Sequence, residues 1–331
     1  VLAMQRDPSG VLARLLEGNR TAIAGRIAGA FRNIGFGRFA DDILSTMRAA
    51  GHVVRETDPF EQRLAPMEFR REPSPQVHRI RLMWGRMRGD VVGRFPAPAR
   101  RHDIDAYLHA VDDIYVTDAY HSLSIEGYRV RRELIERVRS GQWNPDTDED
   151  RKHRDALAAR GYWQAFNVVK KSVRAVLEGA NAGAVADDDH GAWYRELFGP
   201  SVQTGLIKAA DLAGYRNSRV FIRRSKHVPM SEDAVRDAMP AFFELLRDEP
   251  DPAVRVVLGH FMLVYIHPYV DGNGRIGRFL MNVMMAAAGY PWTVIPVQER
   301  DHYMAALEAA SVDQNIVPFA DFLAERIRHP G

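Results

Sequence analysis

Residues 267–278, which read HPYVDGNGRIGR, bring together residue types that could act on a phosphate ester. Gly272, Asn273 and Gly274 form a Gly-Asn-Gly turn that leads directly into a helical pattern. Glycines let backbone N–H groups converge on a ligand without interference from Cβ atoms, and the N-terminus of the following helix adds partial positive charge. We therefore expect this loop to bind anionic oxygens, with phosphate as the natural ligand.

Four side chains around the loop would complete a phosphate site. Arg275 and Arg278 lie three positions apart, where they could hold different phosphates of one polyphosphate. Asp271 supplies the hard oxygen ligand that suits Mg²⁺, and His267 has a pKa suited to accepting a proton at neutral pH. Each residue alone is more typical of a cap, a turn or a solvated helix face. Their combination within twelve residues indicates a catalytic site.

Helices must position this loop from both sides. Asp251, a helix N-cap, begins an apolar helical pattern that ends just before the loop, and a second pattern follows it until Gly289. Residues 181–189 are small and acidic, which predicts a loop. Residues 214–229 favour extended structure and predict a hairpin. Further helices are predicted over residues 23–50, 107–119, 130–138, 157–177 and 231–247.

The twelve-residue segment resembles the signature of the Fic family, H-P-F-x-D/E-G-N-G-R-x-x-R, with Tyr269 where Phe is usual. The similarity extends over roughly residues 105–327, and residues 1–102 have no comparable match. The resemblance implies a helical fold whose members mostly move AMP from ATP onto a hydroxyl group of a target protein.

The resemblance also implies individual roles. His267 would take the proton from a Ser, Thr or Tyr hydroxyl of the target, and Asp271 would hold Mg²⁺. The segment before Val228 falls where the family places its flap over the nucleotide, and Tyr303 matches an aromatic residue near the adenine. The nucleotide-binding residues implied in this way are Arg224, Ser225, Lys226, His227, Asp271, Gly272, Asn273, Gly274, Arg275, Ile276, Gly277, Arg278 and Tyr303.

A second motif lies upstream. Ser122, Glu126 and Gly127 match the family's inhibitory pattern, S/T-x-x-x-E-G/N, which implies a helix that lies against the active site. Ser122 and Glu126 are one helical turn apart on one face, so the Glu126 carboxylate could pair with Arg278. An arginine occupied in this way cannot hold a γ-phosphate. The other interpretation is an ordinary helix end at Gly127.

The composition is that of a globular protein. The chain has 331 residues, of which 46% are hydrophobic and 27% charged, and it contains no Cys, which excludes disulfides, thiolate catalysis and zinc-thiolate sites. No stretch approaches the roughly 20 apolar residues of a membrane helix, and no basic-then-apolar leader precedes Asp7. We expect a cytoplasmic protein.

Charge is distributed unevenly. Residues 1–102 carry 18 Arg and 10 acidic residues, net +8, which leaves −6 for residues 103–331. Two helices followed by an extended segment near Val53 would fit a winged-helix-like module that contacts nucleic acid, with Arg26, Arg32, Arg38 and Arg48 on phosphates. The alternative is an arginine-rich face that packs partly against the acidic remainder.

Together the patterns predict a mainly α protein: a Fic-type helical bundle with a short β-hairpin flap, preceded by a small basic N-terminal module. The expected divisions are residues 1–102 for that module and a linker, 103–213 for a helical region with the inhibitory helix near 105–127, and 214–331 for the catalytic core.

The main functional hypothesis is an autoinhibited protein adenylyltransferase that uses ATP and Mg²⁺ and modifies another protein or itself. Alternatives are a DNA-binding or regulatory protein with a nucleotide-sensing site, an enzyme with another phosphorylated donor, and an enzyme that removes AMP with Glu126 orienting a water. A silent phosphate-binding scaffold would not need a base at His267. The target, the donor base and the oligomeric state are left open.

Overall fold

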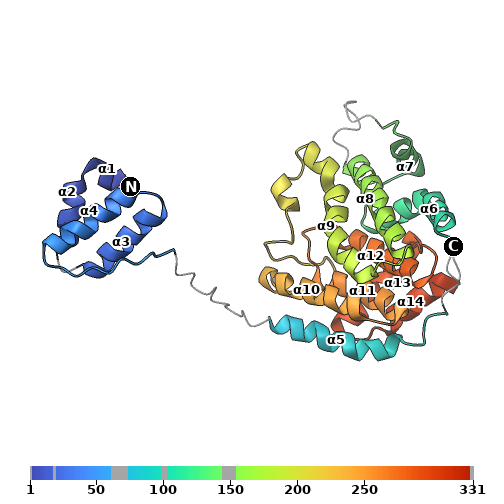
Figure 1. The fold of residues 1–331 in the computed structure, drawn as a ribbon. Helices are drawn as coiled ribbons and strands as arrows, with labels where there is room; N and C mark the ends of the chain where they lie inside the picture. Colours follow the sequence, from blue (N-terminus) through green and yellow to red (C-terminus); the bar gives the residue numbers. More distant parts are fainter. Residues whose placement is uncertain (1, 18–19, 61–73, 98–102, 144–153, 329–331) are drawn as a thin grey trace. The chain divides into compact units, whose positions relative to one another are not determined.

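The computed structural model describes residues 2–17, 20–60, 74–97, 103–143 and 154–328. Their secondary structure is helical, with no β-strand in these ranges, which confirms the predicted mainly α class. Contacts divide the chain into two compact units, residues Val1–Glu72 and Pro73–Gly331 (Figure 1). None of the helices in the described ranges is both long and apolar enough to cross a bilayer.

The helices of the first unit are α1 (Leu2–Arg6), α2 (Pro8–Leu16), α3 (Thr21–Asn33) and α4 (Gly37–Ala49). Those of the second unit are α5 (Pro75–Val91), α6 (Ile104–Ile125), α7 (Arg132–Arg139), α8 (Arg154–Leu177), α9 (Ala182–Gln203), α10 (Glu232–Asp248), α11 (Pro252–Ile266), α12 (Asn273–Ala288), α13 (Arg300–Val312) and α14 (Val317–Arg328), with the short 3₁₀ turns η1 (Ala209–Leu212) and η2 (Val297–Glu299).

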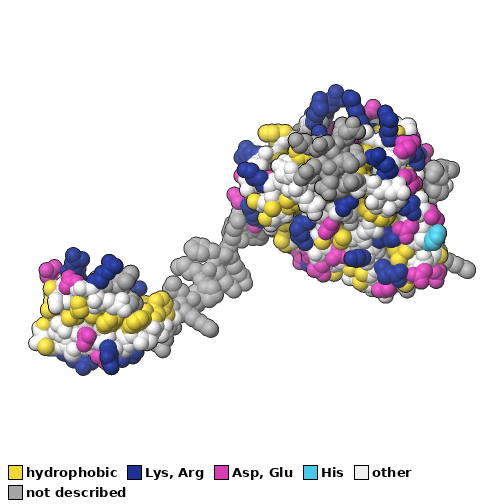
Figure 2. Space-filling view, turned by 90° about the horizontal axis from the view of Figure 1, so that it is seen from above, with side chains coloured by type: hydrophobic (Ala, Val, Ile, Leu, Met, Phe, Trp, Pro, Cys, Tyr) yellow, Lys and Arg dark blue, Asp and Glu magenta, His cyan; other side chains and the backbone are white. Residues whose placement is uncertain are grey.

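Among its described residues, 2–17 and 20–60, the first unit is a small helical module with no β-strand that could form a wing. Thr57 donates its N–H to the Gly25 carbonyl at 3.1 Å, so the segment that follows α4 lies directly on α3. A Cβ on Gly29 would come within 2.3 Å of the Thr57 carbonyl, so glycine permits this approach. The predicted extended segment therefore pairs with a helix and not with a second strand. Figure 2 shows a band of apolar side chains across this unit.

The basic excess lies mostly outside this unit. Residues 1–72 carry 11 Arg and 9 acidic residues, net +2, so residues 73–102 hold +6 of the excess. Arg32, one of the expected phosphate contacts, pairs with Asp41 and Glu56 at 2.8 and 2.6 Å. On the face of the second unit shown in Figure 2, basic and acidic side chains are interspersed. Arg32 is therefore engaged by acidic residues of its own unit, and nucleic-acid binding by this unit stays a prediction.

Helix α12 is the centre of the second unit. Of its 16 residues 13 are buried, and it packs against α11, α8, α9 and α6 (Figure 1). Gly277 permits the close approach of α11, since a Cβ there would lie 3.1 Å from the His260 ring. The N-terminus of α12, which carries the Gly-Asn-Gly turn, is thus held from several sides. The boundary expected at residue 213 is absent because helices from both sides of it contact α12.

Two local expectations were wrong. Residues 181–189 begin α9, because the Asn181 Oδ1 accepts from the Ala184 N–H at 3.0 Å as an N-cap and the first turns bury Ala182 and Ala186 against neighbouring helices. Residues 214–229 form no β-hairpin: the turn at Ser225 bonds to a carboxylate on α13 instead of a partner strand.

Helix α5 was assigned to the N-terminal module and linker, but it packs on α10, α11 and α14 of the second unit. Its main anchor is Glu249, whose side chain is 3% exposed. Glu249 accepts from Trp84 Nε1 at 3.1 Å, Arg88 Nε at 3.0 Å and the Asp251 N–H at 2.9 Å. On the surface beside it, Arg81 and Glu244 pair at 2.6 Å with both side chains about half exposed.

We expect Glu249→Ala to lower the free energy of unfolding by about 2–3 kcal/mol, because the buried Trp84 N–H and the Asp251 N–H lose their acceptor. Glu244→Ala removes an exposed pair with the same helix and should cost less than about 1 kcal/mol. Urea unfolding of both variants measures the difference. Equal losses would show that α5 is not anchored through Glu249.

Candidate functional site

A turn of six residues between α11 and α12 forms the centre of the site. Asn273 closes it: its Oδ1 accepts from the Tyr269 N–H at 2.9 Å and its Nδ2 donates to the Tyr269 carbonyl at 2.8 Å. Gly272 has φ 83°, a conformation that favours glycine, and a Cβ there would lie 2.8 Å from the Phe198 ring. The turn is therefore rigid and leads its N–H groups into the start of α12.

Arg216 fixes the entrance of the turn from the side. Its backbone N–H donates to the Pro268 carbonyl at 2.9 Å, and its Nε donates to the His267 carbonyl at 2.8 Å. The same guanidinium donates to the carbonyls of Ser218 and Met230, and the residue is 2% exposed. One buried side chain thus joins the turn to both ends of the segment expected to be the flap.

His267 ends α11 in the left-handed conformation, with φ 56°. Its Nδ1 lies 3.2 Å from the Val264 carbonyl, which assigns the ring proton to Nδ1 and leaves Nε2 as the acceptor. Burial lowers the pKa of His267 to about 4, and the positive charge of Arg216 acts in the same direction. The imidazole is therefore neutral at pH 7 and able to take a proton.

Arg275 is a buried cation without hydrogen bonds to its Nε and Nη2 atoms within the described chain. It is 1% exposed and lies between the rings of Tyr128 and Phe198, at 5.2 and 5.0 Å from their centroids. Its nearest carboxylate is Asp271, with Nη2 at 3.4 Å from Oδ1. Cation–π contacts hold the guanidinium in place while its N–H groups remain available to an anion.

Arg278, by contrast, is already occupied. Its Nη2 donates to Glu126 Oε1 at 2.7 Å and to the Ser122 carbonyl at 3.0 Å, and its Nε donates to Ser122 Oγ at 2.9 Å. Burial alone would lower the pKa of Arg278, but the attraction of Glu126 raises it. The ion pair expected between the two motifs is present.

Glu126 also covers the turn itself. A Cβ on Gly274 would lie 2.4 Å from Glu126 Oε1 and 3.3 Å from Arg278 Nη1. The carboxylate therefore lies against the backbone at the start of α12, where an anion is expected to bind. Glycine at position 274 leaves room for this oxygen.

Three polar side chains of α6 and its C-cap lie on the face of the helix that is turned toward Arg278. Asp118, Ser122 and Glu126 follow one another at one-turn spacing, and Asp118 accepts from the Tyr162 hydroxyl at 2.6 Å. Burial raises the pKa of Asp118 to about 6, although that hydrogen bond opposes the shift. The end of α6 is held by Arg300, whose Nε donates to the Ile125 carbonyl at 2.9 Å.

Residues 224–227, expected to form the flap and called the flap segment below, are held by one carboxylate of α13. Glu308 accepts from the Ser225 hydroxyl at 2.5 Å and from the Lys226 N–H at 2.7 Å. His227 lies with its Nε2 2.9 Å from the Tyr265 carbonyl. Arg224, at φ 64°, forms the tip with a left-handed conformation. A cavity of about 280 Å³ lies between this segment and α13, lined in part by Arg224, Ser225 and His227.

Three of the expected nucleotide-binding residues are buried or face other helices in this structure, and their role stays a prediction. Ile276 is fully buried in α12, and Gly277 faces His260 on α11. Tyr303 is 1% exposed and its hydroxyl bonds to His260 Nε2 at 2.7 Å. Met304, its neighbour on α13, lines the cavity in its place.

Several residues of the site are not among those that the sequence patterns predict. Tyr128 directly follows the upstream motif, and Arg216 belongs to the segment that resembled the family, so both carried a signal. Phe198 and Glu308 carried none, since an aromatic residue and a glutamate on amphipathic helices are ordinary there. Their roles arise only when folding brings Phe198 of α9 against Arg275 and Glu308 of α13 against Ser225.

The donor set suits a Mg²⁺ ion held mainly by phosphates. Asp271 is 56% exposed and faces a cavity of about 360 Å³ that Arg275 also lines. Within the described ranges no three His, Cys, Asp or Glu side chains gather around one point. Mg²⁺ in phosphate sites is commonly bound through one or two carboxylates together with phosphates and waters, so a single Asp fits this type of site.

Comparisons with known proteins agree with this geometry. Residues 188–285 match the sequence model of the Fic/DOC family. The chain is 29% identical over 219 residues to a protein adenylyltransferase Fic of Nematostella vectensis, covering 65% of this chain and 47% of the relative. It is 26% identical over 223 residues to protein adenylyltransferase fic-1 of Caenorhabditis elegans, covering 64% and 40%. The chain thus spans about half the length, or less, of these curated relatives.

Solved structures share the fold. Fic-1 of C. elegans (residues 134–508 of that protein) superposes with a TM-score of 0.53 at 18% identity, over 97% of this chain and 89% of that chain. A Fic family protein from Desulfovibrio desulfuricans G20 gives a TM-score of 0.52 at 20% identity, over 78% and 74%. The Fic-type helical fold expected from the sequence is confirmed.

Two asparagines of α12 allow a test of the turn. Asn282 bonds to the backbone of Thr293 in the same way as Asn273 bonds to that of Tyr269. Its Nδ2 donates to the Thr293 carbonyl at 3.1 Å, and its Oδ1 accepts from the Thr293 N–H at 2.7 Å. We expect Asn273→Ala and Asn282→Ala to lower the free energy of unfolding by similar amounts, about 2–4 kcal/mol, because each leaves two buried backbone groups unpaired. Only Asn273→Ala should also weaken the binding of inorganic triphosphate, measured by calorimetry.

Proposed function

The chain carries a Fic/DOC domain, and we propose that it is a protein adenylyltransferase that moves AMP from ATP to a Ser, Thr or Tyr hydroxyl of a protein. The observation that carries the proposal is the meeting of a neutral His267 with two buried guanidinium groups at the start of α12. A base and a polyphosphate clamp on one rigid turn are what nucleotidyl transfer needs. The curated relatives named protein adenylyltransferase support the same reaction.

The reaction follows from the positions of these groups. A lone pair of the target hydroxyl attacks the α-phosphorus of ATP, and the new O–P bond replaces the bond from that phosphorus to the bridging oxygen. Pyrophosphate leaves with the bonding electrons. The hydroxyl proton passes to His267 Nε2, the atom that the Val264 contact leaves unprotonated. Arg275, with free N–H groups, binds the phosphates and neutralises charge that develops on them.

Asp271 would hold the Mg²⁺ ion. When bound beside the phosphates, the metal supplies charge neutralisation on the leaving pyrophosphate. The protein's part is to keep the Asp271 carboxylate exposed at the turn and oriented by its contact with Arg275.

Glu126 restrains this site. It occupies Arg278 and lies against Gly274, so the γ-phosphate and the carboxylate compete for one guanidinium and one stretch of backbone. We infer that the arrangement with Glu126 on Arg278, in which α6 is also docked through Ser122, is the inhibited state. ATP can bind productively only when Glu126 withdraws.

We expect His267→Asn to reduce transfer roughly 100- to 10,000-fold while ATP binding stays within a few-fold of wild type, because the base acts on the target hydroxyl. Asn is chosen because it tolerates the left-handed conformation at φ 56° better than Ala does. Label from α-labelled ATP measures transfer, and calorimetry measures binding. A parallel loss of ATP affinity would contradict the assigned role.

The pH profile gives a separate test of the same base. The pKa of His267 is lowered to about 4, so the neutral form predominates above that value and is lost only as the pH falls through it. We expect the transfer rate of the wild-type chain to stay level down to about pH 5 and to fall below it. A decline centred near the ordinary His value of about 6.5 would show that His267 is not desolvated during the reaction.

We expect Glu126→Gly to raise transfer by about tenfold or more, because it frees Arg278 for the γ-phosphate. Arg278→Ala combined with Glu126→Gly should return the rate to a low level, since the freed guanidinium is the source of the gain. Initial rates of the four proteins at saturating ATP and Mg²⁺ measure this coupling. A gain that persists without Arg278 would mean that Glu126 acts in another way.

A further inference from the structure

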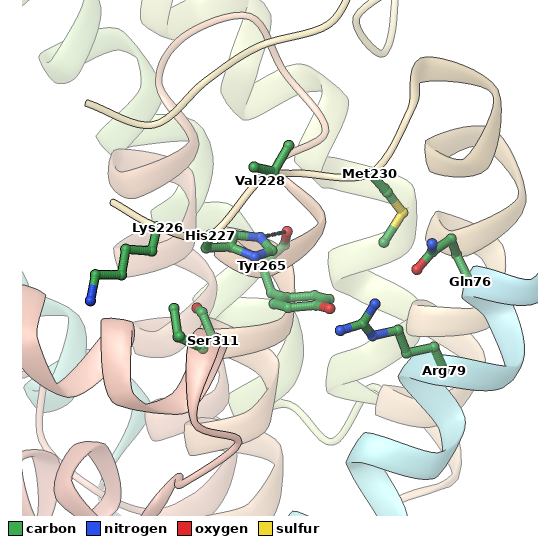
Figure 3. A pocket seen from close by; sticks show the side chains of 9 residues that line it. Gln76, Arg79, Lys226, His227, Val228, Met230, Tyr265 and Ser311 are labelled. Carbon is green, nitrogen blue, oxygen red and sulfur yellow. Dashed lines mark hydrogen bonds between the residues drawn. The ribbon is translucent and has the colours of Figure 1, made fainter. Parts of the chain in front are cut away.

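A second cavity lies on the other side of the flap segment and belongs to none of the roles described so far. It measures about 270 Å³ and is bounded by Gln76 and Arg79 of α5, His227 and Met230 of the flap region, and Tyr265 of α11 (Figure 3). It shares His227 and the end of α13 with the cavity under the flap. Two of its six polar lining residues thus come from α5, which lies outside the residues that match the Fic/DOC family.

Arg79 differs from the other arginines of α5. Arg81 and Arg88 pair with carboxylates of the second unit at 2.6 and 3.0 Å, and Arg86 bonds to an amide oxygen at 3.4 Å. Arg79 has no ion pair or side-chain hydrogen bond within the described ranges. Figure 3 shows its guanidinium pointing toward the hydroxyl end of Tyr265.

The groups that face this cavity are donors of hydrogen bonds. Gln76 points its amide toward the same space as Arg79, and the Tyr265 hydroxyl has no hydrogen-bond partner among the described residues (Figure 3). No carboxylate of the described residues lines the cavity, and Lys226 is a second basic residue at its edge. A guanidinium with a phenol and an amide beside it suits a planar carboxylate, which accepts two N–H bonds from Arg and further bonds from neutral donors.

The position of the cavity relates it to the reaction. His227 lines the cavity, its Nε2 lies 2.9 Å from the Tyr265 carbonyl, and its charge is near enough to His267 to lower the pKa of that imidazole. A segment of a target protein that lies along the flap with its hydroxyl near His267 would therefore pass over this cavity.

We propose that this cavity is a specificity subsite in which Arg79, Gln76 and Tyr265 bind the carboxylate of an Asp or Glu close to the modified hydroxyl of the target. The proposal rests on the proposed function, since it concerns the target of the same site. It makes α5 the part of this chain that selects among hydroxyl-bearing segments.

The test compares matched pairs of short fluorescent peptides that carry a Thr and one Glu or, at the same position, one Gln, with the Glu scanned along the peptide. Transfer from α-labelled ATP is measured with the full chain carrying Glu126→Gly, and binding is measured by anisotropy without ATP. We expect at least one Glu peptide to be preferred over its Gln partner by about tenfold in kcat/KM and in affinity. Arg79→Gln should abolish the preference, and Arg79→Glu should reverse it toward Lys peptides.

Arg81→Gln is the matched control, because it removes the same charge from the same helix outside the cavity and should leave the preference unchanged. Transfer to peptides with no Glu preference, or a preference lost equally in Arg81→Gln, overturns the subsite and leaves the proposed function standing. Binding that prefers Glu through Arg79 in a chain that transfers no AMP supports the carboxylate site and overturns the proposed function. Displacement of the peptide by free glutarate at equal concentration would show a site for small dicarboxylates and overturn its role in target selection.

Discussion

Two buried guanidinium groups on the central helix impose the constraint on which the rest of the site depends. Arg275 and Arg278 are 1% and 4% exposed, and a charge removed from water must be compensated by an opposite charge or by other polar contacts. The aromatic rings of Tyr128 and Phe198 hold Arg275, and Glu126 compensates Arg278. A polyphosphate would satisfy both groups at once, and the turn before α12 is shaped to admit it.

The same constraint explains how inhibition can be built into the fold at small cost. Buried Arg278 needs an anionic partner, which Glu126 supplies here; under the proposed function the same contact would exclude the γ-phosphate. A ligand shifts such an equilibrium only by its difference in affinity for the two states. The strength of the proposed inhibition would therefore depend on how firmly α6 is held, here through Ser122 and through Arg300 at its C-terminal end.

Helix α5 shows that basic residues clustered in one segment can be paired with acidic residues far along the chain. Its arginines made the first hundred residues look like a nucleic-acid surface, yet Arg81 and Arg88 pair with acidic residues of the second unit. Arg79 is the exception, and it faces a cavity beside the flap. The composition of the segment therefore indicated a polyanion, while the contacts of Arg81 and Arg88 are internal ion pairs and Arg79 belongs to the subsite that we propose.

The sequence alone determined the turn and its helices, because glycine, asparagine and the caps at Asp251 and Gly289 act through local backbone geometry that needs no distant partner. It also determined which two motifs carry the charges of the Glu126–Arg278 pair. Only the tertiary structure decided that the flap segment is held by Glu308 without strands, that Tyr303 belongs to the core, and that α5 lines a cavity. These outcomes depend on packing between elements far apart in the chain, where many residues share the same helical pattern and burial selects among them.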